Sequence, residues 1–309
     1  YTGAVTLGAD LSMSTSSNGS VVFASTVNGA KSLTVSTNGT GDVTMVGAVG
    51  GTTALTGLTI TTDVLNAPAI TLATNGALSI TNGGASEITG IIGGSGVTLT
   101  KAGAGTLTLS GANSYTGATH IDAGTLKLTG SLSTSTDVVM SGVAVWDLQS
   151  AQTVATLTMA SGNSITNTAG TSSLSVNGAS TLANSITTSG AQTYTGAVTL
   201  GADLSVTTTN GAVTFSSGVT GSGKALTVST GSGDIAMSTI GVSGTPVGAV
   251  TLNSTGVTTL GGAVYASSVT TNAGGSVAIN TGTIATSGNQ TYNDAVTLGT
   301  DLSMSTSSD

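Results

Sequence analysis

The residues YTGAVTLGADLS stand at 1–12 and recur without a change at 194–205. A third copy, YNDAVTLGTDLSMSTSS, lies at 292–308 and matches residues 1–17 at 14 of 17 positions. Repetition this faithful is typical of a protein built as an array along one axis rather than around one core. Because the chain starts and stops at equivalent points of the pattern, we expect it to be an excerpt from a longer fibre.

The copies also divide the chain into modules. The first two are followed by similar segments, KSLTVSTNGTGDVTM at 31–45 and KALTVSTGSGDIAM at 224–237. Insertion of whole rungs lengthens a solenoid without breaking it. We therefore predict one continuous solenoid with a module start at 1–45, extra rungs at 46–187, a second module at 188–285 and the start of a third at 286–309.

Composition excludes several classes of protein. Among 309 residues 5% are charged, 3% are aromatic and 38% are hydrophobic, whereas an ordinary domain is roughly 25% charged. Disordered chains combine low hydrophobicity with high charge, which is the opposite balance. The net charge is −8 with only four basic residues, so we expect no nucleic-acid partner. No apolar run approaches the roughly 20 residues of a membrane span.

The local pattern is an alternation with a period of two. Triplets such as Leu33-Thr34-Val35, Leu58-Thr59-Ile60 and Leu226-Thr227-Val228 indicate short strands with aliphatic side chains on one face and hydroxyls on the other. Asn-Gly corners such as Asn75-Gly76 separate them. Tandem hairpin sandwiches would need linkers and large core residues. The pattern therefore predicts an all-β parallel β-helix, and rungs of roughly 20 residues would give about 15 coils.

The most specific motif is VTLTKAGAGTLTLSGANSYTGATHIDAGTLKL at 97–128. It opens with Leu99-Thr100-Lys101, continues with a Gly-x-Gly-Thr-Leu strand and an Asn-x-Tyr-x-Gly turn, and closes with Ala-Gly-Thr-Leu-x-Leu. This order resembles the autotransporter-associated β-strand repeat of bacterial passenger domains. The TYTGAVTLGADLSV modules on either side are similar to repeats of filamentous-haemagglutinin-like surface proteins.

These resemblances imply a right-handed parallel β-helix that is exported through an outer-membrane pore. They also imply an extracellular or cell-surface location. They carry over no catalytic residue and no cofactor.

Two acidic positions are weak candidates for calcium. Asp42 and Asp234 follow Gly-Thr-Gly and Gly-Ser-Gly, which resemble half of the Gly-rich loop of calcium-binding β-rolls. Calcium requires six to eight oxygen ligands, and here each motif occurs once per module. The alternative is that each carboxylate accepts backbone N–H groups at a corner. Asp10, Asp203 and Asp301 share a place in LGxDLS and allow the same alternative.

Enzymatic activity has little support in the sequence. His120 is the only histidine, with Lys101 and Lys127 on either side and Asp122 close by, but no nucleophile or third partner is marked. Lyases and hydrolases built on β-helices use clustered carboxylates, which this chain spaces apart. The five tyrosines, at 1, 115, 194, 265 and 292, either stack on sugars or fill gaps at corners.

The sequence thus predicts a non-enzymatic stalk or fibre segment of a secreted bacterial cell-surface adhesin. One alternative is a subunit of a self-assembling extracellular filament, sheath or matrix, and another is a glycan-binding β-helix. The expected partners are an outer-membrane export pore during secretion, and then copies of the chain itself or a ligand on a host or other surface.

Overall fold

The computed structural model describes residues 1–307, which form short strands joined by corners and contain no helix. The chain divides into two compact units, unit 1 at Tyr1–Val154 and unit 2 from Ala155 onward. In each unit the strands stack as coils of a parallel β-solenoid, about 15 turns in all. This confirms the predicted all-β parallel β-helix. Within the described residues, no helix is long and apolar enough to cross a membrane.

Unit 1 contains sixteen strands, most of them short. They are β1 (Val5–Thr6), β2 (Leu11–Ser14), β3 (Val21–Phe23), β4 (Val27–Asn28), β5 (Ser32–Ser36), β6 (Val43–Met45), β7 (Leu55–Thr62), β8 (Leu65–Ala67), β9 (Ile70–Asn82), β10 (Ala85–Ile88), β11 (Ile92–Gly93), β12 (Thr98–Ala102), β13 (Thr106–Leu109), β14 (Thr119–Leu128), β15 (Val138–Leu148) and β16 (Ala151–Val154).

Unit 2 contains the remaining strands of the described residues. They are β17 (Leu157–Met159), β18 (Ser164–Thr166), β19 (Ser173–Val176), β20 (Ser180–Thr188), β21 (Gln192–Tyr194), β22 (Val198–Thr208), β23 (Val213–Phe215), β24 (Val219–Thr220), β25 (Leu226–Ser229), β26 (Ile235–Met237), β27 (Val247–Asn253), β28 (Val257–Leu260), β29 (Val264–Thr271), β30 (Ser276–Ile279), β31 (Thr283–Thr286), β32 (Gln290–Thr291), β33 (Ala295–Leu298) and β34 (Ser303–Thr306).

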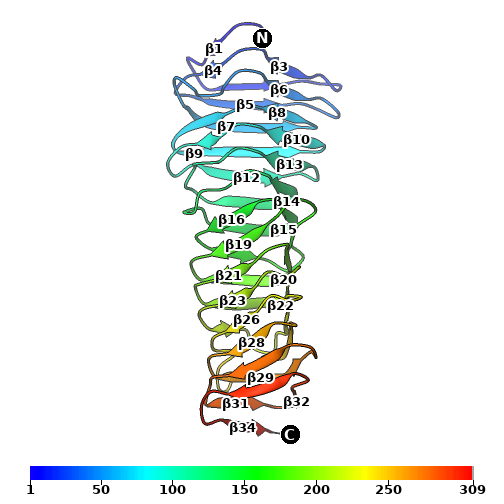
Figure 1. Ribbon diagram of the computed structural model, residues 1–309. Helices are drawn as coiled ribbons and strands as arrows, with labels where there is room; N and C mark the ends of the chain where they lie inside the picture. The colour runs from blue at the N-terminus through cyan, green and yellow to red at the C-terminus, as the bar shows by residue number, and fades with distance from the viewer. Residues whose placement is uncertain (308–309) are drawn as a thin grey trace. The chain divides into compact units, whose positions relative to one another are not determined.

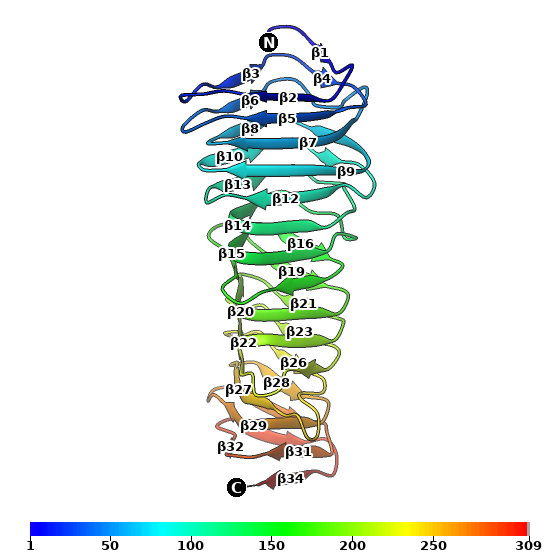
Figure 2. The same ribbon diagram turned by 180° about the vertical axis from the view of Figure 1, so that it is seen from behind.

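Three parallel ladders run through unit 1. One pairs β2, β5, β7, β9, β12 and β14 in turn, and Figure 2 shows most of these strands one above the next. A second pairs β3, β6, β8, β10, β13 and β14 and is visible in Figure 1. The third is narrow and consists of the β1–β4 pair, the single bridges Val27–Val49 and Val49–Ile70, and the pairing of β9 with β11. From β1 to β11, each coil therefore bonds to its neighbours along three faces.

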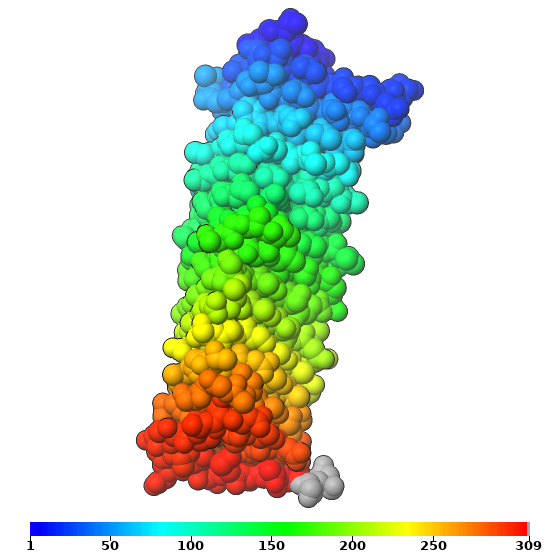
Figure 3. All heavy atoms as spheres, turned by 45° about the vertical axis from the view of Figure 1, so that its right-hand side comes forward, coloured from blue at the N-terminus to red at the C-terminus, as the bar shows by residue number. Residues whose placement is uncertain are grey.

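Unit 2 repeats this plan. One ladder pairs β20, β22, β25, β27, β29 and β32, and a second pairs β21, β23, β26, β28, β30 and β33. The third passes through β22, β24, Ile240, β29, β31 and β34. Within each unit, successive coils lie in direct contact on the face seen in Figure 3.

The alternation of the sequence accounts for the interior. Leu33, Leu58, Leu78 and Leu99 stack in register on successive coils and are at most 1% exposed. Burying each such side chain contributes about 2 kcal/mol. The Thr and Ser residues between them face outward, so the surface is hydroxylated rather than charged. The coils vary in length, since paired residues are 25 apart between Leu33 and Leu58 (58 − 33) and 20 apart between Leu58 and Leu78 (78 − 58).

Polar side chains inside the solenoid cap the corners. The Thr37 hydroxyl donates to the Gly41 carbonyl oxygen at 2.6 Å, and the Thr188 hydroxyl donates to that of Gly190 at 2.7 Å. Each bond satisfies a carbonyl group that the turning backbone leaves without a strand partner. Asn75 and Asn184 take positive φ angles of 59° and 60° where β9 and β20 bend, a conformation that Asn tolerates better than most residues.

Candidate functional site

The two calcium candidates each bond to backbone on the following coil. Asp42 Oδ1 accepts the N–H of Val64 at 3.2 Å, and Asp234 Oδ1 accepts the N–H of Val257 at 2.8 Å. The described residues contain no group of three or more His, Cys, Asp or Glu side chains placed to hold a metal ion. Each carboxylate thus accepts a backbone N–H group at a corner of the solenoid.

Two of the three aspartates of LGxDLS, Asp10 and Asp203, behave in the same way. Asp10 Oδ1 accepts the N–H of Ser32 at 2.8 Å, and this hydrogen bond lowers the pKa of the Asp10 carboxyl. Asp203 Oδ1 accepts the equivalent N–H, that of Ala225, at 2.9 Å. Asp301 lies in an exposed corner after β33. The carboxylates of Asp10 and Asp203 thus tie one coil to the next.

The residues around His120 do not converge on one point. His120 lies in β14 between Thr100 and Val139 of the adjacent coils, on the outward-facing positions of the strand. Asp122 accepts a hydrogen bond from the Ser141 hydroxyl at 2.7 Å. Lys101 is wholly buried, so it lies inside the solenoid while His120 lies outside it.

Lys101 occupies a column of aliphatic residues, where it pairs with Ile80 on one side and Ile121 on the other. Burial lowers the pKa of its ammonium group from 10.5 to about 8. The Nζ atom donates to three backbone carbonyl oxygens, those of Ala102 (2.8 Å), Gly103 (2.9 Å) and Ala123 (3.1 Å).

The place of Lys101 follows from the corner beside it. On the two preceding coils the corner is capped by Thr62, whose hydroxyl donates to Gly41 O at 2.9 Å, and by Asn82, whose Nδ2 donates to Gly84 O at 2.7 Å. The next residue in that column is Gly103, which lies against the backbone of Asn82 and has no side chain. Lys101, two residues earlier, supplies a donor to this corner instead, and it bonds to carbonyl oxygens other than those that Thr62 and Asn82 cap. Sequence reasoning missed this role, although Lys101 holds an inward position in the alternation after Leu99.

The repeated SGxQTY segment forms a second buried network. Gln192 Nε2 donates to Thr207 O at 3.0 Å and to the Thr188 hydroxyl at 3.0 Å, and Gln192 Oε1 accepts the Tyr194 hydroxyl at 2.7 Å. Tyr194 is 1% exposed and its ring stacks on Phe215 with centroids 4.8 Å apart. Burial strongly raises the pKa of the Tyr194 hydroxyl. This tyrosine therefore serves packing.

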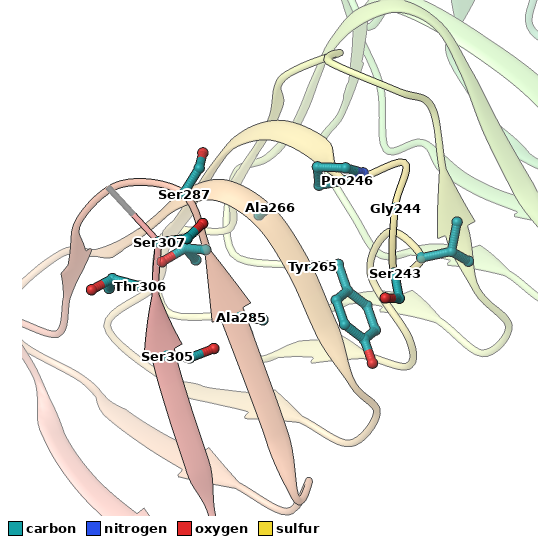
Figure 4. A pocket seen from close by; sticks show the side chains of 12 residues that line it. Ser243, Gly244, Pro246, Tyr265, Ala266, Ala285, Ser287, Ser305, Thr306 and Ser307 are labelled. Carbon is teal, nitrogen blue, oxygen red and sulfur yellow. The ribbon is translucent and has the colours of Figure 1, made fainter. Parts of the chain in front are cut away.

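The other tyrosines divide between packing and the surface. Tyr115 is wholly buried and bonds to the Thr119 hydroxyl at 2.6 Å, while Tyr292 is partly covered and bonds to Gln290. Tyr1 is 63% exposed and stacks on Phe23. Tyr265 lines a cavity with a volume of about 300 Å³, which lies in unit 2 beside the turn at 242–246 (Figure 4).

Comparison with known proteins gives one match. Residues 99–128 match the family model of the passenger-associated-transport-repeat, which confirms the resemblance predicted for 97–128. The matched segment comprises β12 without its first residue, β13, β14 and the connections between them, and it covers about a tenth of the chain. No curated protein and no solved structure matches the chain.

Proposed function

We propose that this chain is a non-enzymatic stalk segment of an exported bacterial surface protein, and that this protein acts as an adhesin. The match at 99–128 carries the proposal, since a passenger repeat implies a secreted or surface-exposed protein. The adhesive end belongs elsewhere in the parent chain. Stacked coils give such a segment its length, because each added coil extends the solenoid by one strand spacing, about 4.8 Å.

The way the passenger repeat joins its neighbours supports a structural role. β12 pairs in register with β9 over five residues, from Thr98↔Ala77 to Ala102↔Thr81. β14 pairs with β15 over nine. The repeat is thus a set of ordinary coils in unit 1, continuous with the ladders around it, rather than a separate domain. Continuous pairing of this kind within unit 1 suits a stalk, because each coil is bonded to the next.

Surface display tests the exported role. Residues 1–309 are placed between a signal peptide and an outer-membrane translocator, and protease accessibility on intact cells is measured. We expect the wild-type chain to reach the surface in a protease-resistant form. Leu107→Asp places a charge in the aliphatic interior of β13 and should abolish resistance, whereas Thr108→Asp on the outward face of the same strand should not. Retention of the wild-type chain inside the cell would refute the export proposal.

Electron microscopy and mass measurement of the native material separate the stalk from the filament. One very long chain that forms an isolated rod with a differentiated end is expected. Uniform filaments of chains near 309 residues would instead identify a self-assembling subunit. If cells that display this segment alone adhere as strongly as cells with the parent protein, the adhesive end lies within it, and the stalk assignment is wrong.

A further inference from the structure

The cavity beside Tyr265 is built from two parts of unit 2. Its floor consists of outward positions on consecutive coils, where Tyr265, Ala285 and Ser305 follow one another in register. Its wall is the tight turn at 242–246, closed by an antiparallel bridge between Val242 and Thr245. Figure 4 shows the Tyr265 ring projecting from its strand towards this turn, with small side chains on the neighbouring strands.

The wall is held in place. Thr245 N donates to Val242 O at 3.1 Å and closes the turn, and Gly223 N donates to Pro246 O at 2.9 Å and joins its end to another coil. Proline fixes its own φ angle, which further restricts the turn. The cavity is therefore preformed, which reduces the entropy that binding must overcome.

The lining combines one aromatic face with hydroxyl groups. Hydroxyls come from Ser243, Ser287 and Ser305 together with neighbouring threonine and serine residues, and the lining contains no Asp, Glu, Lys, Arg or His. In the described part of the chain the Tyr265 hydroxyl forms no hydrogen bond with the protein. Unlike the buried Tyr194, Tyr265 is only partly buried, so its hydroxyl is available to a ligand.

Comparison of the two units shows that the solenoid does not need this tyrosine. The Tyr265 N–H donates to Ile240 O at 2.7 Å, and the Thr71 N–H of unit 1 donates in the same way to Val49 O at 2.8 Å. The glycines that follow these acceptors, Gly50 and Gly241, lie against the carbonyl oxygens of Thr71 and Tyr265 respectively. Thr71 is thus the counterpart of Tyr265, and a coil of this solenoid accommodates threonine at this place.

The turn also differs between the two units. The segment between Val49 and Leu55 contains five residues, GGTTA, whereas that between Ile240 and Val247 contains six, GVSGTP. The longer turn in unit 2 is exposed from 242 to 246 and stands beside the tyrosine. The tyrosine and the longer turn therefore occur together in unit 2, although the packing of a coil requires neither of them.

We propose that this cavity binds a neutral saccharide, with one face of a pyranose ring against Tyr265 and its hydroxyls bonded to the surrounding serine residues. The C–H groups of a sugar face suit an aromatic ring, and its hydroxyls match groups that both donate and accept. An anionic ligand finds no cation in the lining and meets a chain of net charge −8. A volume of about 300 Å³ lies at the small end of ligand sites, which suits one or two rings.

This binding site does not rest on the proposed stalk function. All residues that line the cavity belong to unit 2, whereas the stalk proposal rests on the match at 99–128 in unit 1. The test uses the full chain and saturation-transfer NMR with the methyl glycosides of glucose, galactose, mannose and N-acetylglucosamine. Methyl glucuronide serves as the anionic comparison. We expect at least one neutral glycoside to bind with a Kd of about 1 mM, typical of a small ligand in an open site. Absence of binding by all four, or preference for the glucuronide, would overturn the proposal.

Three variants test the assignment to Tyr265. Tyr265→Thr copies the unit 1 residue and should weaken binding about tenfold without unfolding the chain, while Tyr265→Phe keeps the ring and should stay within about threefold of the wild type. Tyr1→Thr removes an exposed tyrosine outside the cavity and should leave binding unchanged. Equal affinity in Tyr265→Thr and the wild type would contradict the proposal.

The source of the sugar is decided by a second measurement. Neutral oligosaccharides immobilised through their reducing ends are compared with free glycosides for binding by the wild-type chain and Tyr265→Thr. Tyr265-dependent binding to the immobilised chains identifies the end of a surface glycan as the ligand, and binding to free glycosides alone identifies a free sugar. Immobilised binding that survives in Tyr265→Thr would contradict this site.

Discussion

Replacement of Lys101 by methionine tests whether an ammonium group is buried in the aliphatic interior. Methionine has a similar length and suits the column between Ile80 and Ile121, so Lys101→Met removes the charge with little change in packing. The wild-type chain buries a group whose pKa is lowered from 10.5 to about 8. Its stability should therefore depend on pH in a way that the variant does not share.

The sign and size of this pH dependence follow from proton linkage. Below pH 8 Lys101 is protonated in both states, and the folded chain bears the full cost of burial. Between pH 8 and 10.5 the unfolded chain holds more protons than the folded one, so the free energy of unfolding rises with pH. From about pH 7.5 to about pH 9.5 the wild type should gain about 2 kcal/mol relative to Lys101→Met.

Urea unfolding at the two pH values, followed by tryptophan fluorescence, measures this gain. Trp146 is the only tryptophan, is wholly buried, and pairs with Leu126 of the matched repeat, so it reports on the same unit. The difference between the two proteins cancels the titration of the tyrosines, which both contain. Lys127→Met, which removes a half-buried lysine at an outward position of β14, is the matched control and should reproduce the wild-type dependence on pH.

A constant stability difference between the wild type and Lys101→Met across this range would refute the reasoning. It would mean that the three carbonyl oxygens around Nζ offset the loss of water completely. A difference that moves in the opposite direction would show that these bonds favour the ammonium form over the neutral amine in the folded state.

Three further changes test the corners and the acidic positions. Gln192→Leu should lower the free energy of unfolding by about 2–3 kcal/mol, because it leaves buried polar groups without partners. Urea unfolding followed by circular dichroism measures this loss. Gln290→Leu at a partly buried position should lower it less, and equal losses would contradict this account. Asn184→Val should lower the free energy of unfolding by about 1–2 kcal/mol more than Asn184→Gly in the same assay, since valine is strained at positive φ. Equal losses would show that the bend does not need this conformation. Asp234→Ala should cost about 1 kcal/mol and Asp234→Asn less, because the amide oxygen still accepts the Val257 N–H. Calcium should leave the Tm unchanged within about 1 °C, and a rise that Asp234→Ala abolishes would identify a metal site instead.

Much of the fold follows from short-range pattern. The alternation in Leu33-Thr34-Val35 places both aliphatic side chains inside, and the structure buries both to 1% exposure or less. Parallel stacking was predictable because the chain offers few large core residues and no linkers, so small aliphatic columns had to form the core. The position of Asn75 at a bend with positive φ agrees with the Asn-Gly signal.

The sites were less accessible to sequence reasoning, because they depend on contacts between coils. Lys101 is explained by Gly103, whose missing side chain matters only when Thr62 and Asn82 are known to stand in the same column. Tyr265 resembled the other tyrosines in sequence. Its distinction comes from the turn at 242–246, which lies beside it through pairing of Ile240 with Val264 rather than through any motif.

The direction of the ladder hydrogen bonds determines how each unit would respond to tension. These bonds link coil to coil, so a pull along the stacking direction detaches the end coil while the remaining coils stay paired. A coil such as the 22 residues from Leu11 to Leu33 (33 − 11) releases about 70 Å of extended chain when it opens. A unit under tension is therefore expected to lengthen in many small steps at modest force and to dissipate the energy of a sudden increase in load. The released coils can then refold on the coils that remain paired.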